Sequence, residues 1–194
     1  MNLTLDQFNK WMINFQRQIN GHREYLNEVD SKIGDGDHGD NMVKGIDAAI
    51  DALNNQKDYN LTEALKIVSN AFLKDGCGAA AVLYENAFLY MSKRSVDTSE
   101  IGDLLTAGTQ GIQKRGNTQA EDKTMYDVWL PLSQAVKNDE LSRNLIKLTV
   151  DTTKDMVATK GRAAALGNRS KGYVDPGAVS SGYLFCALLD MEDI

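Results

Sequence analysis

Apolar residues recur every three or four positions along nearly the whole chain, and this helical periodicity is the feature that most restricts the fold. No stretch alternates strictly between apolar and polar residues over the length of a strand. The pattern therefore predicts an all-α protein of about eight helices. The apolar stripes cover residues 5–19, 42–53, 61–72, 101–112, 125–132, 141–156 and 183–191, and a further helix is expected from about Cys77 to Lys93.

No internal repeat, low-complexity run or linker interrupts the 194 residues, so we expect one domain spanning residues 1–194. The sequence Asp175-Pro176-Gly177 predicts a helix start, with an aspartate cap and a proline in the first turn. Pro131 falls inside an apolar stripe, where a proline removes a helical hydrogen bond. Cys77 and Cys186 are too few for a disulfide framework and are expected to be buried thiols.

The formal net charge of −6 argues against a nucleic-acid binder, which would normally present a basic surface. No apolar run is long enough to cross a bilayer, and the first residues show an amphipathic pattern rather than a signal peptide. We therefore expect a cytoplasmic protein that binds neither nucleic acid nor membranes. An acidic enzyme that acts on an anionic substrate needs a metal ion or a local cluster of arginines.

Residues 27–45, NEVDSKIGDGDHGDNMVKG, gather Asp30, Asp35 and Asp37 among several glycines. Glycine permits the positive φ angles with which a short segment can curl and bring three carboxylates together. Oxygen ligands on so short a stretch suit a hard cation, and Mg²⁺ held by few carboxylates usually shares its coordination with substrate phosphates. A solvated acidic turn is the alternative that composition alone leaves open.

Two known acidic loops fit this stretch poorly. An EF-hand that began at Asp35 would have Asp40 at the position of its glycine and Ile46 at the position of its last glutamate. The sequence 35–37 is also similar to the nucleophile loop of haloacid-dehalogenase-like phosphatases. That loop should follow a buried strand, and residues 29–34 do not have the sequence of one.

Further features of the sequence bear on whether an anion binds beside the acidic stretch. A helix starting near Asp40-Asn41 would direct its free N–H groups and positive dipole end toward the acidic stretch. His38 could then contact a phosphate or cap the turn. Residues 74–86 begin a helix with small side chains that let another group approach closely, for which tight helix packing is the ordinary explanation. Residues 160–182 carry Arg162 and Arg169, and arginines in such a loop either bind phosphate or form surface ion pairs.

Taken together, these segments resemble the dihydroxyacetone kinase L family over about residues 4–190. The resemblance implies a barrel of eight antiparallel helices with a nucleotide bound at one end. It rests on GDGDHG at 34–39 followed by Asn41-Met42, on DKTM at 122–125, on KGRA at 160–163 with Leu166-Gly167 and Arg169-Ser170, and on DPGA at 175–178 with Ser180-Ser181.

The resemblance also implies the site residues. Asp30, Asp35 and Asp37 match carboxylates that hold two Mg²⁺ ions against the nucleotide phosphates, and no further catalytic residue is implied. The positions that match ADP or ATP contacts are His38, Gly39, Asp40, Asn41, Ala79, Ala80, Gly116, Met125, Arg162, Asp175, Pro176 and Gly177.

Family members of the phosphotransferase-system type keep ADP bound as a cofactor. A phosphohistidine of an M subunit phosphorylates this ADP, and the γ-phosphate passes to dihydroxyacetone held covalently on a K subunit. The resemblance thus implies a phosphotransferase subunit with a K-type and an M-type partner, and it leaves a homodimer open.

The chain departs from the family pattern at three places. CGAAA at 77–81 stands where the family usually has Gly-Gly-x-Ser-Gly, Glu121 replaces a glycine, and alanines at 164–165 replace Ser-Tyr. Loss of one charge-assisted contact costs on the order of 1–3 kcal/mol, which would lower the nucleotide affinity by roughly ten- to a hundredfold and leave the metal site intact. The departures keep three alternatives open: an ATP-exchanging kinase subunit, a nucleotide-binding regulator without turnover, and a Mg²⁺-dependent phosphohydrolase.

Overall fold

The computed structural model describes residues 1–76 and 78–191, and within them all the regular elements are helices, as predicted. Cys77, from which one helix was expected to start, lies outside the described residues. The elements are α1 (Leu5–Gly21), α2 (Arg23–Ile33), α3 (His38–Asn55), α4 (Leu61–Lys74), α5 (Gly78–Arg94), α6 (Ile101–Gly116), α7 (Tyr126–Lys137), α8 (Arg143–Thr152), the 3₁₀ helices η1 (Thr153–Asp155) and η2 (Arg162–Ser170), and α9 (Pro176–Leu189).

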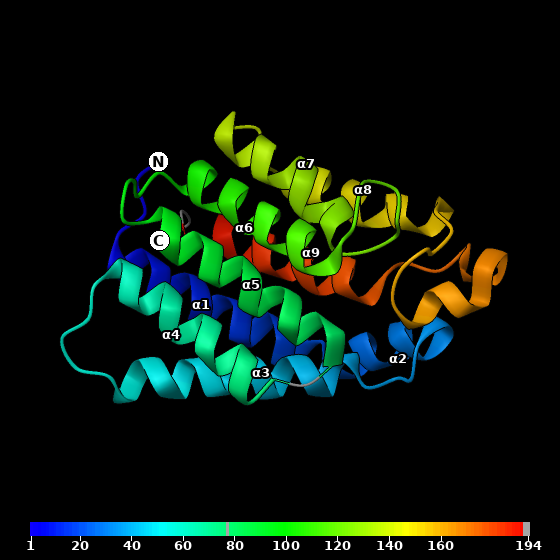
Figure 1. Ribbon diagram of the computed structural model, residues 1–194, viewed down its shortest axis with the longest axis horizontal. Coiled ribbons are helices and arrows are strands. Elements are labelled where there is room, and N and C mark those ends of the chain that lie inside the picture. Colours follow the sequence, from blue (N-terminus) through cyan, green and yellow to red (C-terminus); the bar gives the residue numbers. More distant parts are fainter. Residues whose placement is uncertain (77, 192–194) are drawn as a thin grey trace.

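Eight of the α-helices close into a ring. Helix α1 contacts α3, then α4, α5, α6, α7, α8 and α9 follow in order, and α9 returns to α1. Neighbouring helices in the ring run in opposite directions (Figure 1). The prediction of a barrel of eight antiparallel helices is therefore confirmed.

Helix α2 is the element that the sequence analysis missed. It packs against α3 at one end of the ring, and it is held there by Leu26, Val29 and Ile33. Asp30 consequently lies on a helix and not in a loop. The following helix α3 begins at His38, earlier than the expected start near Asp40-Asn41.

The helix boundaries follow from local chemistry. Thr4 and Gln7 form a capping box at the start of α1, and the Asp175 carboxylate accepts the N–H of Ala178 at the start of α9. The predicted Asp-Pro-Gly helix start is thus confirmed. Pro131 lies inside α7, as its place in the apolar stripe indicated.

Aromatic side chains fill the interior of the ring. Trp11, Phe72, Tyr84 and Trp129 are all fully buried, and Phe72 stacks on Tyr84 with ring centroids 5.4 Å apart. Each indole finds a buried acceptor, because Trp11 donates to the Leu184 carbonyl at 2.8 Å and Trp129 donates to Ser181 Oγ at 3.0 Å. The core therefore leaves neither of these polar groups without a partner.

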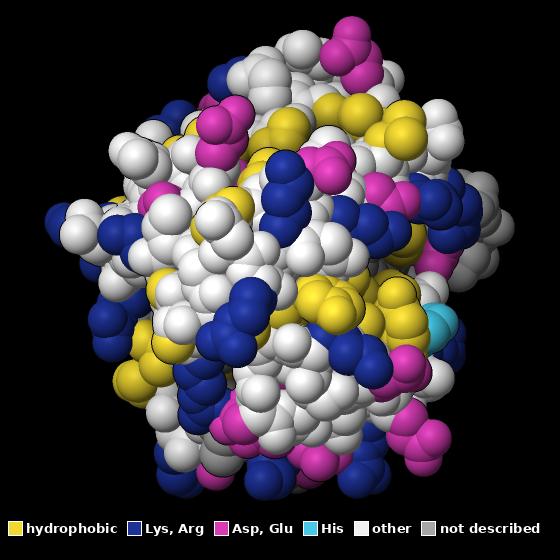
Figure 2. Space-filling model, turned by 90° about the vertical axis from the view of Figure 1, so that its right-hand side faces the viewer, with side chains coloured by type: hydrophobic (Ala, Val, Ile, Leu, Met, Phe, Trp, Pro, Cys, Tyr) yellow, Lys and Arg dark blue, Asp and Glu magenta, His cyan; other side chains and the backbone are white. Residues whose placement is uncertain are grey.

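Because neighbouring helices alternate in direction, the connections α2–α3, α4–α5, α6–α7 and α8–α9 all lie at the same end of the ring (Figure 1). Figure 2 looks onto this end, where lysine and arginine side chains are interspersed with acidic and apolar ones. Among the described residues, every helix is too short or too polar to span a bilayer. The end with these four connections is where a site built from several loops can form.

The α6–α7 connection holds Glu121 at a φ of 72°, which explains why a glycine suits this position. We expect Glu121→Gly to raise the free energy of unfolding by about 1 kcal/mol, because relief of the left-handed strain exceeds the added chain entropy. Urea denaturation measures the change. Glu140→Gly, at another exposed glutamate without a positive φ, is the control and should not stabilise. A destabilised Glu121→Gly protein would contradict the prediction.

Candidate functional site

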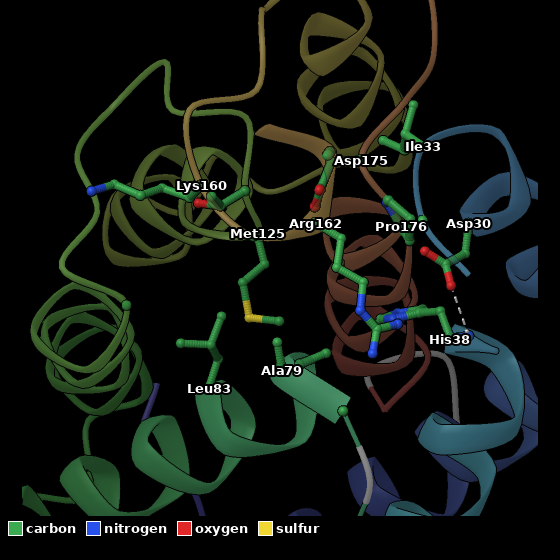
Figure 3. Close-up of a pocket in the computed structure, with 18 of the residues that line it drawn as sticks. Asp30, Ile33, His38, Ala79, Leu83, Met125, Lys160, Arg162, Asp175 and Pro176 are labelled. Atoms are coloured by element: carbon green, nitrogen blue, oxygen red, sulfur yellow. Dashed lines mark hydrogen bonds between the residues drawn. The ribbon is translucent and has the colours of Figure 1, made fainter. Parts of the chain in front are cut away.

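A cavity of about 390 Å³ opens at this end of the ring, a size suited to a small organic ligand. Its walls come from α2 and the loop after it, from the starts of α3, α5 and α9, from the end of α6 with the α6–α7 connection, and from the α8–α9 connection. In Figure 3, Met125, Leu83 and Ala79 form one side of the cavity, and His38, Asp30 and Arg162 lie on the other. The cavity thus has an apolar side and a charged side.

The charged side contains the three predicted carboxylates. Asp30, Asp35 and Asp37 each offer one oxygen, and these three oxygens lie within 4.8 Å of one another. Like charges at this spacing repel unless a cation lies between them. Three carboxylate oxygens without nitrogen or sulfur suit Mg²⁺, so the residues present fit the metal that the sequence analysis expected.

Asp30 also builds the loop that carries the other two carboxylates. Its Oδ2 accepts the backbone N–H groups of Gly36 and Asp37, each at 3.0 Å, and of His38 at 3.2 Å. A Cβ on Gly34 would come within 2.1 Å of Asp30 Oδ1, and Gly36 has a φ of 79°. Glycine is therefore required at 34 for space and at 36 for backbone conformation.

His38 is buried at the start of α3, with its Nε2 3.0 Å from Ser180 Oγ. Desolvation lowers its pKa to about 4, against the opposing effects of Asp30 and Asp37, so the ring is neutral at pH 7. Ser180 also contacts the Tyr84 hydroxyl at 3.1 Å. His38 therefore joins the cavity to the polar groups of the core rather than capping the turn.

Cationic side chains lie on the same cavity. Arg162 of η2 forms an ion pair with Asp35, and Figure 3 shows it reaching over His38. Lys160 and Arg115 also line the cavity. An anion that entered here would meet these cations as well as any metal bound by the aspartates.

Thirteen of the fifteen predicted site residues line the cavity, and Gly39 and Asp40 are the two that do not. A Cβ on Gly39 would come within 2.0 Å of the Arg23 carbonyl oxygen, so this glycine lets α2 and α3 approach closely. Asp40 faces Arg23, with 2.5 Å between its Oδ1 and Arg23 Nε, and this hydrogen bond lowers the pKa of Asp40. Both residues thus pack α3 onto α2 behind the predicted phosphate site.

Several cavity residues were not predicted, among them Leu83, Arg115, Lys123 and Lys160. Lys160 and Lys123 belong to the motifs KGRA and DKTM, and Arg115 directly precedes Gly116, which had been predicted as a site residue. Both Lys160 and Arg115 directly precede a glycine, and this position beside a glycine could have indicated that they belong to the site. Leu83 gave none, because an apolar residue on a helix usually belongs to the core.

Asp175 titrates in an unusual range, because desolvation raises its pKa to about 7. The folded state therefore binds a proton that the unfolded chain has lost, so ionisation of Asp175 reduces stability as pH rises from about 4 to about 7. His38 has the opposite effect, because its lowered pKa makes stability rise between about pH 4 and 6.5. The two contributions partly cancel in the wild-type protein.

We therefore expect Asp175→Asn, which keeps a capping oxygen, to change the pH profile rather than the fold. Between pH 5 and 7 its free energy of unfolding should rise relative to wild type by up to about 1.4 kcal/mol per pH unit. Urea denaturation with EDTA and without nucleotide measures this difference. Parallel pH profiles for the two proteins would contradict the prediction.

The cavity, its carboxylate cluster, its cations and the helix N-termini in its wall define a class of protein. This class is all-helical, with a site that suits a phosphorylated ligand together with a divalent cation. The profile of the DAK2 domain matches residues 32–190 of the chain. The chain belongs to the DAK2 domain family, as the resemblance in its motifs had indicated.

Relatives of known name cover nearly all of the chain. It is 40% identical to the "PTS-dependent dihydroxyacetone kinase, ADP-binding subunit DhaL" of Lactococcus lactis, over 97% of this chain and 98% of that one. It is 38% identical to the "PEP-dependent dihydroxyacetone kinase 1, ADP-binding subunit DhaL" of Listeria innocua, over 94% of each. The Escherichia coli ADP-binding subunit DhaL is 30% identical over 93% of each chain.

A solved structure shares the fold. The dihydroxyacetone kinase from C. freundii in complex with AMP-PNP and Mg²⁺ superposes with a TM-score of 0.78 at 18% sequence identity. The superposition covers 98% of this chain and 34% of that chain, so this chain spans about a third of its length. At this identity the likeness establishes the helical barrel and no more.

Proposed function

We propose that the chain is the nucleotide-binding subunit of a dihydroxyacetone kinase, with ADP and two Mg²⁺ as cofactors. In this proposal an M-type subunit passes a phosphoryl group from its phosphohistidine to the bound ADP. The γ-phosphate then passes to dihydroxyacetone on a K-type subunit. The names of relatives that cover nearly the whole chain support this assignment.

The observation that carries the proposal is the carboxylate cluster on the wall of the cavity. Asp30, Asp35 and Asp37 converge where the N-terminus of α3 begins, beside a cavity of about 390 Å³. Mg²⁺ bound there would neutralise charge on the transferring phosphate. The chain itself supplies the ligand oxygens, the helical N–H groups and the neutral His38.

The remaining cavity residues fit the other parts of a nucleotide. Met125, Leu83 and Ala79 offer an apolar surface for a base, and Arg162, which lies beside His38 and Asp30, offers positive charge for phosphates. We propose contacts to the nucleotide from the full predicted set, including the backbone of Gly39 and Asp40 in the first turn of α3. Phosphoryl transfer then requires positioning and charge neutralisation rather than a covalent enzyme intermediate.

The test is to purify the protein natively, desalt it with Mg²⁺ present, and measure the nucleotide released on denaturation by mass spectrometry. We expect near-stoichiometric ADP from the wild type and none from Asp35→Ala. Asp51→Ala, which removes an exposed carboxylate on α3 away from the cavity, is the matched control and should retain ADP. Equal ADP in all three proteins would refute the proposed role of the aspartates.

One observation favours a second candidate, an ATP-exchanging kinase subunit. The cavity wall at Ala79 and Ala80 presents methyl groups and no hydroxyl for a phosphate. A wild-type protein that purifies without nucleotide but binds Mg²⁺ and ATP reversibly would support this reading. Release of phosphate from ATP without a partner would indicate a phosphohydrolase, and binding without any transfer to a ketose would indicate a regulator.

The wider assignments follow from the same proposal. We propose one domain over residues 1–194, a cytoplasmic location, and docking of the K-type and M-type subunits at the end that bears the cavity. A homodimer is a further arrangement to be tested by sedimentation. The small-molecule acceptor is dihydroxyacetone or a related ketose.

A further inference from the structure

Lys123 is a buried lysine in the α6–α7 connection, with only 1% of its surface exposed. Its Nζ donates to four backbone carbonyl oxygens, at 2.8 Å to Thr153, 3.2 Å to Met156, 2.8 Å to Ser170 and 2.6 Å to Tyr173. An ammonium group has three protons, so these four acceptors saturate it. Desolvation lowers the pKa of Lys123, and the surrounding carbonyl oxygens compensate the buried charge.

The four carbonyls belong to the two ends of one segment, residues 153–173, which joins α8 to α9. Thr153 and Met156 lie where the segment leaves α8, and Ser170 and Tyr173 lie where it returns toward α9. The Gly172 N–H donates to the Lys154 carbonyl at 2.7 Å and also joins the two ends. The Lys123 ammonium group therefore makes four of the hydrogen bonds that close the base of this segment, beside those from the N–H groups of Gly172 and Ala158.

The middle of the segment carries charged residues to the cavity. Lys160 and Arg162 line the cavity. Thr159, directly before Lys160, is bonded to the residue before Lys123, because the Thr159 N–H donates to the Asp122 carbonyl at 3.2 Å. Gly161 directly precedes η2 and Gly167 interrupts it, with φ angles of 63° and 52°, and a Cβ on either would meet open space. The base of the segment is thus tightly bonded, while its tip meets little of the surrounding protein at these two glycines.

We infer that Lys123 is a positioning residue: by closing the base of segment 153–173 it holds Lys160 and Arg162 over the cavity and so slows release of the bound nucleotide. The inference rests on the proposed function for its ligand. The closure of the segment by the hydrogen bonds of Lys123 is a property of the fold and is testable without nucleotide.

The first measurement is limited trypsin digestion of Lys123→Met with identification of the earliest cuts by mass spectrometry. The segment contains five trypsin sites, at Lys154, Lys160, Arg162, Arg169 and Lys171. We expect the variant to be cut within the segment at least tenfold faster than the wild type. Val68→Ala, a core truncation in α4 away from the cavity, is the control for general destabilisation and should not open the segment.

The second measurement is the rate at which a fluorescent ADP analogue dissociates from the protein in the presence of Mg²⁺. We expect this rate to rise at least tenfold in Lys123→Met and to stay unchanged in Val68→Ala. The inference would be overturned by early cuts spread over the whole chain of Lys123→Met. It would also be overturned if Lys123→Met and Val68→Ala had equal rates of cutting within the segment and of nucleotide dissociation. Should Lys123→Met fail to fold, Lys123→Gln, which keeps two N–H donors, should give a smaller increase in cutting confined to the same segment. A wild type that binds no Mg²⁺ and ADP would refute the proposed function, while the digestion would still decide whether Lys123 clasps the segment.

Discussion

Asp30→Asn is expected to weaken Mg²⁺-dependent ADP binding by about a hundredfold, or about 2.7 kcal/mol, with little change in the melting temperature. The amide oxygen can still accept the three backbone N–H groups of Gly36, Asp37 and His38 that Asp30 Oδ2 now accepts. The charge is lost, and the amide NH₂ group cannot ligate a metal. The substitution therefore separates the role of Asp30 in the loop from its proposed role as a ligand.

After bound nucleotide has been removed with EDTA, isothermal titration of ADP at fixed Mg²⁺ measures the affinity, and the same titration without Mg²⁺ gives the part that does not depend on the metal. Asp51→Asn removes one negative charge from the exposed face of the neighbouring helix α3 and should bind like the wild type. If Asp30→Asn bound ADP as tightly as Asp51→Asn, the carboxylate cluster would not be a metal site.

Gly39→Ala is expected to lower the free energy of unfolding by about 3 kcal/mol and to weaken Mg²⁺ binding as well. The added methyl group would overlap the Arg23 backbone, with 2.0 Å between Cβ and the carbonyl oxygen. Relief requires α2 to move away from α3. Because α2 carries Asp30 and the loop before α3 carries Asp37, the same movement would separate two of the three carboxylates.

Urea denaturation and Mg²⁺ titration of the same preparation test both expectations. Gly21→Ala is the matched control, because a Cβ on Gly21 meets nothing within 4 Å. That variant should fold and bind metal like the wild type. Equal stability of the two alanine variants would show that α2 does not pack on α3 as closely as described.

The helical class and most of the cavity could be predicted from local sequence. Asp35 and Asp37 are two residues apart and Asp30 precedes them by five and seven residues, so their convergence needs only the end of a helix and a tight loop. The capping pattern of Asp175 and Pro176 is likewise encoded within four residues. Such features depend on neighbours in the chain, and for this reason the sequence predicts them well.

Features that depend on distant parts of the chain were beyond such reasoning. Helix α2 was missed because three buried residues give too short a stripe, and the glycines that follow resemble the continuation of a loop. Lys123 donates to carbonyl groups that lie 30 to 50 residues further along the chain, and no sequence pattern near position 123 predicts these contacts. Closure of the ring between α9 and α1 likewise follows from three-dimensional packing rather than from periodicity.

The ring has an even number of helices, so α1 starts and α9 ends at the face opposite the cavity (Figure 1). A tag, a surface anchor or a fused protein attached near either terminus would therefore leave the cavity unobstructed. A fused domain that must deliver substrate to the cavity has instead to pass along the outside of the barrel. With the 16 residues of α6 rising about 24 Å, that path needs a linker of about eight extended residues or more.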